Sequence, residues 1–151
     1  MYSSRFKNCF PSVLKKALQE HLIDFPDSVQ TNFEEIFVYR GVTISAEKPS
    51  LDRSDFMSQM ERQAEKIGLE NLARIPHSRQ WGQYSCSCFK DKEELIQAFK
   101  LPRQDKRIAF GRIHEADGAV LESFDDNTTH VHWFLYDGVD PSEKFQLDEN
   151  D

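Results

Sequence analysis

The stretch from Thr129 to Gly138 constrains the fold of this chain more than any other, because it is its strongest β-strand signal. Its residues are mostly aromatic or β-branched, and alternate side chains of a strand point to opposite faces of a sheet. The two alternating sets are Val131, Trp133 and Leu135 on one face and His130, His132, Phe134 and Tyr136 on the other. We expect the first, purely apolar set to face the core and the strand to lie at the centre of a sheet.

Other segments show the same kind of periodic pattern. Strands are expected over residues 36–44, 81–89, 107–114, 118–124 and 144–147, and helices over 12–21, 52–67 and 91–101. The late strands are close together in sequence, which favours an antiparallel meander. The predicted fold class is therefore α+β: an antiparallel, twisted sheet of about four to six strands, with about three helices packed mainly on one face.

A chain of 151 residues is long enough to bury one hydrophobic core. We expect a single α+β domain over residues 1–147, followed by an acidic, solvated tail over 148–151. The net charge of −7 argues against binding of DNA or RNA, which depends largely on Lys and Arg.

The cellular compartment is predicted from three features that the sequence does not show: a membrane span, a signal peptide and a disulfide framework. No window is apolar over the roughly 18 residues that a membrane span needs, and the first residues lack the apolar core of a signal peptide. The cysteines, Cys9, Cys86 and Cys88, do not have the spacing of a disulfide framework, so buried free thiols are expected for the last two. These observations predict a soluble, cytoplasmic protein that binds neither nucleic acid nor a membrane.

Arg40 interrupts an otherwise apolar strand face. Within the strand over 36–44 it shares a face with Ile36, Val38, Val42 and Ile44. Burying a guanidinium is unfavourable by several kcal/mol unless it is hydrogen-bonded and paired. Arg40 is therefore expected to hold a carboxylate, to reach solvent with its charged end, or to wait for an anionic ligand.

His130 and His132 are the sharpest candidates for a metal site. Histidines two residues apart on a strand point the same way and can share one Zn²⁺ or Fe²⁺ if a neighbouring strand supplies a third ligand. His114, or Glu115 beside it, is the candidate for that ligand. The alternatives are structural histidines without a metal and a pH-sensitive patch.

Two short segments resemble those of a known enzyme family. Tyr39-Arg40-Gly41 and Tyr84-Ser85-Cys86-Ser87 resemble the Arg and Ser-x-Ser segments of ADP-ribosyltransferases. The resemblance implies that Arg40 orients the phosphates of NAD and that Ser85 supports the nicotinamide pocket. The family's Glu-x-Glu motif has no counterpart here, and Glu122 is the nearest candidate for a catalytic glutamate.

Two functional hypotheses follow from the sequence. The first is a non-catalytic interaction module without a cofactor, whose partner is another protein bound by an acidic surface rich in aromatic residues. The second is a small ligand- or metal-binding enzyme, either ADP-ribosyltransferase-like or metal-assisted. It predicts a cleft formed by Arg40, Ser85, His114, His130 and His132, with Zn or Fe as the alternative cofactor at the histidines.

Overall fold

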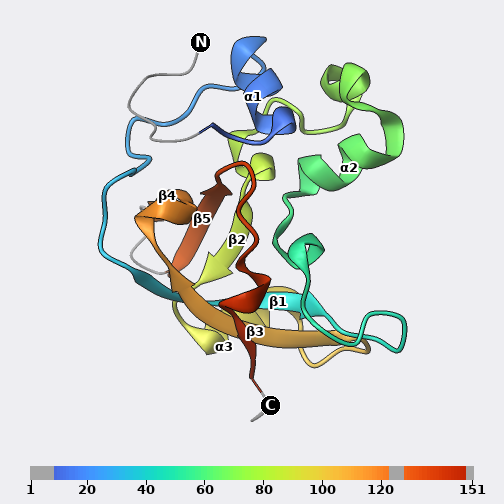
Figure 1. The fold of residues 1–151 in the computed structure, drawn as a ribbon, viewed down its shortest axis with the longest axis vertical. Coiled ribbons are helices and arrows are strands. Elements are labelled where there is room, and N and C mark those ends of the chain that lie inside the picture. Colours follow the sequence, from blue (N-terminus) through green and yellow to red (C-terminus); the bar gives the residue numbers. More distant parts are fainter. Residues whose placement is uncertain (1–8, 123–127, 149–151) are drawn as a thin grey trace.

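A computed structural model describes residues 9–122 and 128–148 of the chain. Six strands form one sheet in the order β4-β5-β2-β1-β3-β6, and each pair of neighbours is antiparallel (Figure 1). The strands are β1 Ile36–Thr43, β2 Cys86–Phe89, β3 Lys106–Ile113, β4 Gly118–Glu122, β5 His130–Leu135 and β6 Gln146–Leu147. The α-helices are α1 Ser12–Gln19, α2 Gln59–Ile67 and α3 Lys92–Phe99. The predicted α+β class is confirmed.

The sheet consists of two halves that meet along a narrow junction. β1 pairs with β3 along its whole length, but it pairs with β2 only where Tyr39 faces Phe89. Figure 1 shows β2 and β5 crossing the direction of β1 and β3. Trp133 on β5 stacks on Phe145, which lies just before β6, with 5.9 Å between ring centroids. β5 and β6 lie near opposite edges of the sheet, so this contact shows that the sheet curls. We call the concave face, on which Trp133 and Phe145 meet, the inner face.

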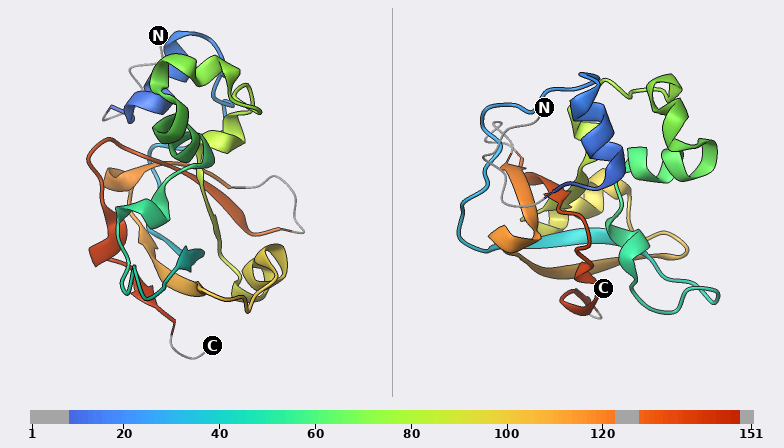
Figure 2. Two further views of the ribbon diagram at one scale, coloured as in Figure 1. Left: turned by 90° about the vertical axis from the view of Figure 1, so that its right-hand side faces the viewer. Right: turned by 45° about the horizontal axis from the view of Figure 1, so that its top comes forward.

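The α-helices pack on the other, outer face. Phe134 and Tyr136, from β5 and the residue after it, belong to the same buried cluster as α1 and α2, whereas Phe89 and Ile108 are buried with Leu95 of α3. The strand register places all four of these sheet residues on one face. Figure 2 shows α1 and α2 together at one end of the molecule and α3 at the other. The predicted packing of the helices mainly on one face is thus confirmed.

The predicted helix over 52–67 is two separate helical segments. Asp52 caps a 3₁₀-helix, Arg53–Phe56, and Ser58 caps α2, each through a capping box with an acidic residue three positions later. Gly68 ends α2 with a φ of 93°, which glycine adopts without strain. The sequence contains two competing start signals, and both are used.

Two strand predictions need correction. Residues 81–84 form a 3₁₀-helix, Trp81–Tyr84, so β2 is only the second half of the expected strand. Tyr84 is buried in the cluster that contains α1 and α2, and its hydroxyl donates a 2.6 Å hydrogen bond to the carbonyl of Ser78. Trp81 in turn packs on His132 and Phe134 of the outer face.

The topology of the late strands also differs from the expected meander. Only β4 and β5 form a hairpin, while β3 pairs with β1 and β6. β5 is therefore second from an edge, and β2 and β1 are central. The inner-face prediction for β5 is confirmed, since Val131, Trp133 and Leu135 are buried. α1 and α2 cover the other face of β5, which gives this near-edge strand the composition expected of a central one.

The ends of two expected segments lie outside the described residues. These are positions 123–124 of the strand over 118–124 and positions 149–151 of the acidic tail. Asp148, the first tail residue, forms a salt bridge of 2.7 Å with Lys92 of α3. Within 9–122 and 128–148, every helix is too short or too polar to cross a bilayer.

Candidate functional site

The structure distributes the five predicted site residues over three places. Ser85, His130 and His132 lie together on the outer face. Arg40 lines a pocket at the end of β1, and His114 follows the last residue of β3. In the sheet, β1 and β2 stand between β3 and β5. The single cleft that the enzyme hypothesis predicts is therefore not formed by these residues.

Ser85 and the two histidines form a compact cluster. The hydroxyl of Ser85 lies 3.0 Å from Nδ1 of His132 and 2.8 Å from the carbonyl of Gly82. The rings of His130 and His132 have centroids 4.1 Å apart. Phe89 stacks on His130 with 4.8 Å between centroids and an interplanar angle of 13°. Packing with aromatic rings, more than hydrogen bonding, thus fixes the orientation of both imidazoles.

Burial keeps these histidines neutral. Burial, together with the neighbouring His130, lowers the pKa of His132 from 6.5 to about 4. Burial also lowers the pKa of His130, although the Glu94 carboxylate acts in the opposite direction. A general base works best with a pKa near the operating pH. His132 is consequently a weak base for activating the Ser85 hydroxyl at neutral pH.

His114 does not complete a metal site with the other histidines. Its side chain is 46% exposed, and Nδ1 lies 3.6 Å from a carboxylate oxygen of Glu35. Glu115 begins a 3₁₀-helix beside it. Over the part of the chain that the structure describes, no three His, Cys, Asp or Glu side chains are grouped so as to hold a metal ion. The predicted third ligand is thus in the wrong place, because β3 is not a neighbour of β5.

Arg40 lies on the inner face of β1, the same face as Val38 and Val42, as the alternation of the strand predicts. Nε donates a 2.9 Å hydrogen bond to the carbonyl of Asp55, and Nη1 donates one of 2.7 Å to the carbonyl of Ser87. These partners are backbone carbonyls and not carboxylates. The guanidinium is thereby fixed in position while its positive charge is left without an ion pair among the described residues.

Three further positively charged side chains line the same pocket as Arg40. They are Arg62 of α2, Lys106 of β3 and Arg103 of the segment before β3. The volume of the pocket is about 340 Å³. Arg62 donates to the carbonyl of Ser54, and Lys106 donates a 2.8 Å hydrogen bond to the hydroxyl of Thr43. We call this the Arg40 pocket. Four positive side chains meet here in a protein whose net charge is −7.

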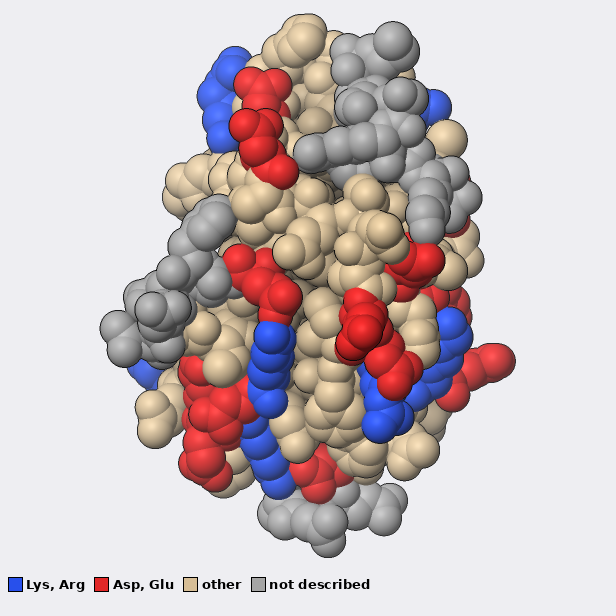
Figure 3. All heavy atoms as spheres, turned by 90° about the vertical axis from the view of Figure 1, so that its left-hand side faces the viewer, with Lys and Arg blue, Asp and Glu red and all other residues tan. Residues whose placement is uncertain are grey.

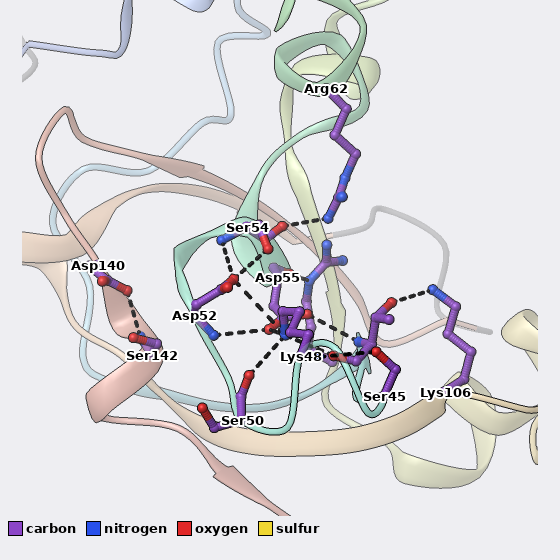
Figure 4. Close-up of polar contacts among 12 residues, drawn as sticks. Ser45, Lys48, Ser50, Asp52, Ser54, Asp55, Arg62, Lys106, Asp140 and Ser142 are labelled. Carbon is purple, nitrogen blue, oxygen red and sulfur yellow. Dashed lines mark hydrogen bonds and ion pairs between the residues drawn. The ribbon is translucent and has the colours of Figure 1, made fainter. Parts of the chain in front are cut away.

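The one acidic side chain among the described lining residues is already engaged. Asp55 is 3% exposed, and its carboxylate accepts hydrogen bonds from Nζ of Lys48 and from the backbone N–H groups of Thr43 and Asp52. Figure 4 shows Lys48 at the centre of these contacts, with Arg62 and Lys106 reaching towards the region from two sides. Because Lys48 neutralises Asp55, the positive charge of the pocket remains in excess.

The excess charge changes the protonation equilibrium of Lys106. Burial lowers the pKa of its ammonium group, and Arg103, Arg62 and Arg40 lower it further, while Asp55 opposes them. On the face in Figure 3, at the left of Figure 1, acidic and basic side chains lie next to one another. At the Arg40 pocket the cations repel each other, and an anion bound among them would relieve that repulsion.

Sequence reasoning missed most of this pocket. It identified Arg40 as a residue that could await an anion, but not Arg62, Arg103 or Lys106. The basic run between Arg103 and Arg107 is a signal that could have been used. Arg62 offers no such signal, because on its helix it is one of several charged residues of the polar face.

A separate group of aromatic side chains lies on the outer face of β1 and β3. The rings of Phe37, Tyr39 and Phe110 have centroids between 5.3 and 6.4 Å apart, and the Arg112 guanidinium lies 5.5 Å from the Phe37 centroid. Phe37 is 38% exposed. We call these four residues the aromatic patch. It is a candidate contact surface, because aromatic and arginine side chains are favoured anchors of binding interfaces.

No protein-family model, curated protein or solved structure matches this chain. The resemblance to ADP-ribosyltransferases therefore remains confined to the two quoted segments. Arg40 and Ser85 lie on or next to neighbouring strands, but Arg40 extends from the inner face and Ser85 contacts His132 on the outer face. Glu122, on β4, is separated from β1 by two strands and forms a salt bridge with Lys90.

Proposed function

We propose that this protein binds a small molecule with two or more negative charges, such as a phosphate ester, in the Arg40 pocket. The observation that carries the proposal is the convergence of Arg40, Arg62, Arg103 and Lys106 around an acidic group already neutralised by Lys48. A ligand anion supplies the missing counter-charge. Arginine suits this task, because its planar fork of N–H groups matches phosphate and carboxylate oxygens.

Arg40 is prepared for such a ligand. Two of its N–H groups bind backbone carbonyls, which leaves the remaining guanidinium N–H groups for ligand oxygens. Holding the guanidinium in advance reduces the entropy lost on binding. The backbone of Gly41 also lines the pocket, next to the ring of Phe99. The combination of fixed charges with a neighbouring apolar wall is typical of small-molecule sites.

Dinucleotides belong among the candidate ligands. The resemblance to ADP-ribosyltransferases implies that Arg40 contacts the phosphates of NAD, and a pyrophosphate carries the charge that the pocket lacks. The proposal concerns binding and assigns no reaction, because Asp55, the only carboxylate among the described lining residues, is held by Lys48.

Isothermal titration calorimetry at low ionic strength tests this proposal with pyrophosphate, ADP and NAD. We expect pyrophosphate to bind, and its affinity to fall by about 10- to 100-fold in Arg62→Gln and in Lys106→Gln, since a hydrogen bond to a charged group contributes about 1.5–3 kcal/mol. Added salt should weaken binding further. Lys15→Gln is the matched control, because it removes one exposed positive charge from α1.

Two outcomes would reject the proposal. The first is that none of the three ligands binds to the wild-type protein at low ionic strength. The second is that Arg62→Gln and Lys106→Gln bind pyrophosphate as tightly as Lys15→Gln does, which would locate the anion elsewhere.

The aromatic patch supports a second candidate function, the binding of another protein. Phe37 and Ile67 are the exposed large hydrophobic residues of the described chain, and only Phe37 has an arginine over its ring. We propose a partner that presents an apolar side chain next to a carboxylate. The measurement is the affinity of a captured and purified partner for Phe37→Ser, with Ile67→Ser as the control. Equal affinity for both variants would exclude the aromatic patch.

A further inference from the structure

A second hollow adjoins the Arg40 pocket. It has a volume of about 630 Å³ and lies between α3 and β3. Leu101 and Lys106 line both hollows, so the two adjoin at these side chains. We call this second one the aliphatic hollow, because Ile96, Leu101, Pro102 and Ile108 form its apolar wall.

The two hollows differ in chemistry. The Arg40 pocket presents four cations, whereas the apolar part of the aliphatic hollow consists of aliphatic side chains and a proline. The cations of the second hollow are Lys92, Lys106 and Arg107. Of these, Lys92 is paired with Asp148, and Arg107 donates a hydrogen bond to the carbonyl of Lys106. Lys106, at the boundary, is the cation that the two hollows share.

We infer that the ligand of the Arg40 pocket is amphipathic: a phosphate or diphosphate head bound by the cations, with an aliphatic body that passes Leu101 into the aliphatic hollow. This inference rests on the proposed function and names the class of ligand for the same site. A combined volume on this scale fits a small molecule of ordinary size.

Neither a simple anion nor a purely apolar molecule would satisfy both hollows. A bare phosphate would leave the apolar wall in contact with water, which forgoes the gain from burying that surface. A neutral apolar molecule would desolvate Lys106 further without supplying a counter-charge. One molecule with both parts removes apolar surface from water and neutralises the cations at once.

The chemistry of the wall selects the kind of body. Among the described residues that line the aliphatic hollow none is aromatic, and the apolar ones offer no side-chain donors or acceptors to read the edge of a base. An alkyl or branched alkyl chain packs against Ile96 and Ile108 without leaving polar groups unpaired. The expected ligand class is therefore an alkyl phosphate or diphosphate.

Two probes with the same head separate the contributions. In isothermal titration calorimetry, methyl diphosphate measures the head alone, and hexyl diphosphate adds the aliphatic body. We expect hexyl diphosphate to bind about 10- to 100-fold more tightly, from the burial of several methylene groups. Ile96→Asn should abolish this gain without changing the affinity for methyl diphosphate. Arg62→Gln should weaken both probes by the same factor, and Ile67→Asn, at an exposed apolar position, should change neither.

A second measurement does not depend on a variant. In the wild-type protein with bound hexyl diphosphate, nuclear Overhauser effects are expected between the terminal methyl group of the probe and the methyl groups of Ile96 and Ile108. Contacts of that methyl group with other residues only would overturn the inference.

The outcomes of the two proposals are distinguishable. If methyl diphosphate binds and hexyl diphosphate binds no more tightly, the amphipathic ligand is excluded while the anion site stands. An unchanged gain in Ile96→Asn likewise excludes the aliphatic hollow. If neither probe binds to the wild-type protein, the proposed function itself fails.

Discussion

The guanidinium of Arg40 donates a hydrogen bond of 2.7 Å to the backbone carbonyl of Ser87. β1 and β2 are in register only at Tyr39 and Phe89, so this contact joins the two strands beyond their backbone pairing. A side chain thus takes over part of a role that backbone groups play elsewhere in a sheet. The same contact aims Arg40 into its pocket.

Replacing Arg40 is expected to destabilise the fold. Arg40→Met keeps much of the aliphatic length but leaves the carbonyls of Asp55 and Ser87 without this donor. We expect the free energy of unfolding to fall by about 1–3 kcal/mol, measured by urea denaturation. Arg74→Met, at an exposed position, is the control and should stay within about 0.5 kcal/mol. A stability of Arg40→Met equal to that of the control would show that the strand junction does not depend on Arg40.

Replacing Asp55 is expected to lower the free energy of unfolding more than replacing other carboxylates of its segment. Asp55→Asn cannot accept all the hydrogen bonds that Lys48 and two backbone N–H groups donate, and it leaves the Lys48 ammonium without its closest counter-charge. We expect a loss of about 2–4 kcal/mol in urea denaturation. Glu47→Gln is the exposed control. If Lys48→Met restored the stability of Asp55→Asn, the cost would be assigned to the unpaired charge; if it did not, to the lost hydrogen bonds.

The buried histidines make stability depend on pH. The pKa of His132 is about 4 in the folded protein and close to 6.5 in the unfolded chain. Between these values the unfolded state binds more protons, so the stabilising contribution is complete above about pH 6.5 and is lost as the pH falls towards about 4. We expect a loss of about 1–2 kcal/mol from this residue, reduced from the full shift because the ring is partly exposed.

Urea denaturation between about pH 7 and about pH 4.5 measures this loss. His132→Gln should show a smaller decrease over the same interval, whereas His114→Gln, at an exposed position, should behave like the wild type. An equally steep decrease in His132→Gln would contradict the assignment to His132.

Adding a side chain at Gly111 is expected to destabilise the fold. A Cβ atom at this position would come within 2.6 Å of the ring of Phe145, which is buried in the inner core. Gly111→Ala should therefore lower the melting temperature and cost about 1–3 kcal/mol through overpacking. Gly82 is the matched control, since the nearest atom to its Cβ would be 3.6 Å away, an ordinary contact distance. A melting temperature of Gly111→Ala equal to that of Gly82→Ala would mean that Phe145 can move aside.

The sequence was informative where a pattern repeats along one element. The alternation in β5 correctly placed Val131, Trp133 and Leu135 on the inner face, and the same reasoning marked Arg40 as an anomaly. It failed for the position of β5 in the sheet. Burial of both faces by α1 and α2 on one side and the curled sheet on the other makes a near-edge strand look central.

The candidate site was harder to predict, because it is assembled across the chain. Arg62, Arg103 and Lys106 come from a helix, a connecting segment and a strand, and the basic run from Arg103 to Arg107 does not by itself show that its residues meet Arg40 and Arg62. Prediction of their meeting requires the strand order, and β1 pairs with β3 across more than sixty intervening positions in the case of Thr43 and Lys106. The histidines were misleading for the same reason, since the partner expected for them belongs to a strand that is not adjacent.

The backbone ladder of the sheet narrows to a single register pair between β2 and β1. Each half of the sheet has its own backbone ladder, while the backbone pairing at the junction consists of one pair of residues and is supplemented by the side chain of Arg40. Under load or heat, separation is expected to start at this junction, ahead of the long β1–β3 ladder. An anion bound to Arg40 would contact the same side chain that joins β1 to β2. Occupancy of the pocket and the resistance of the two halves of the sheet to separation are therefore coupled.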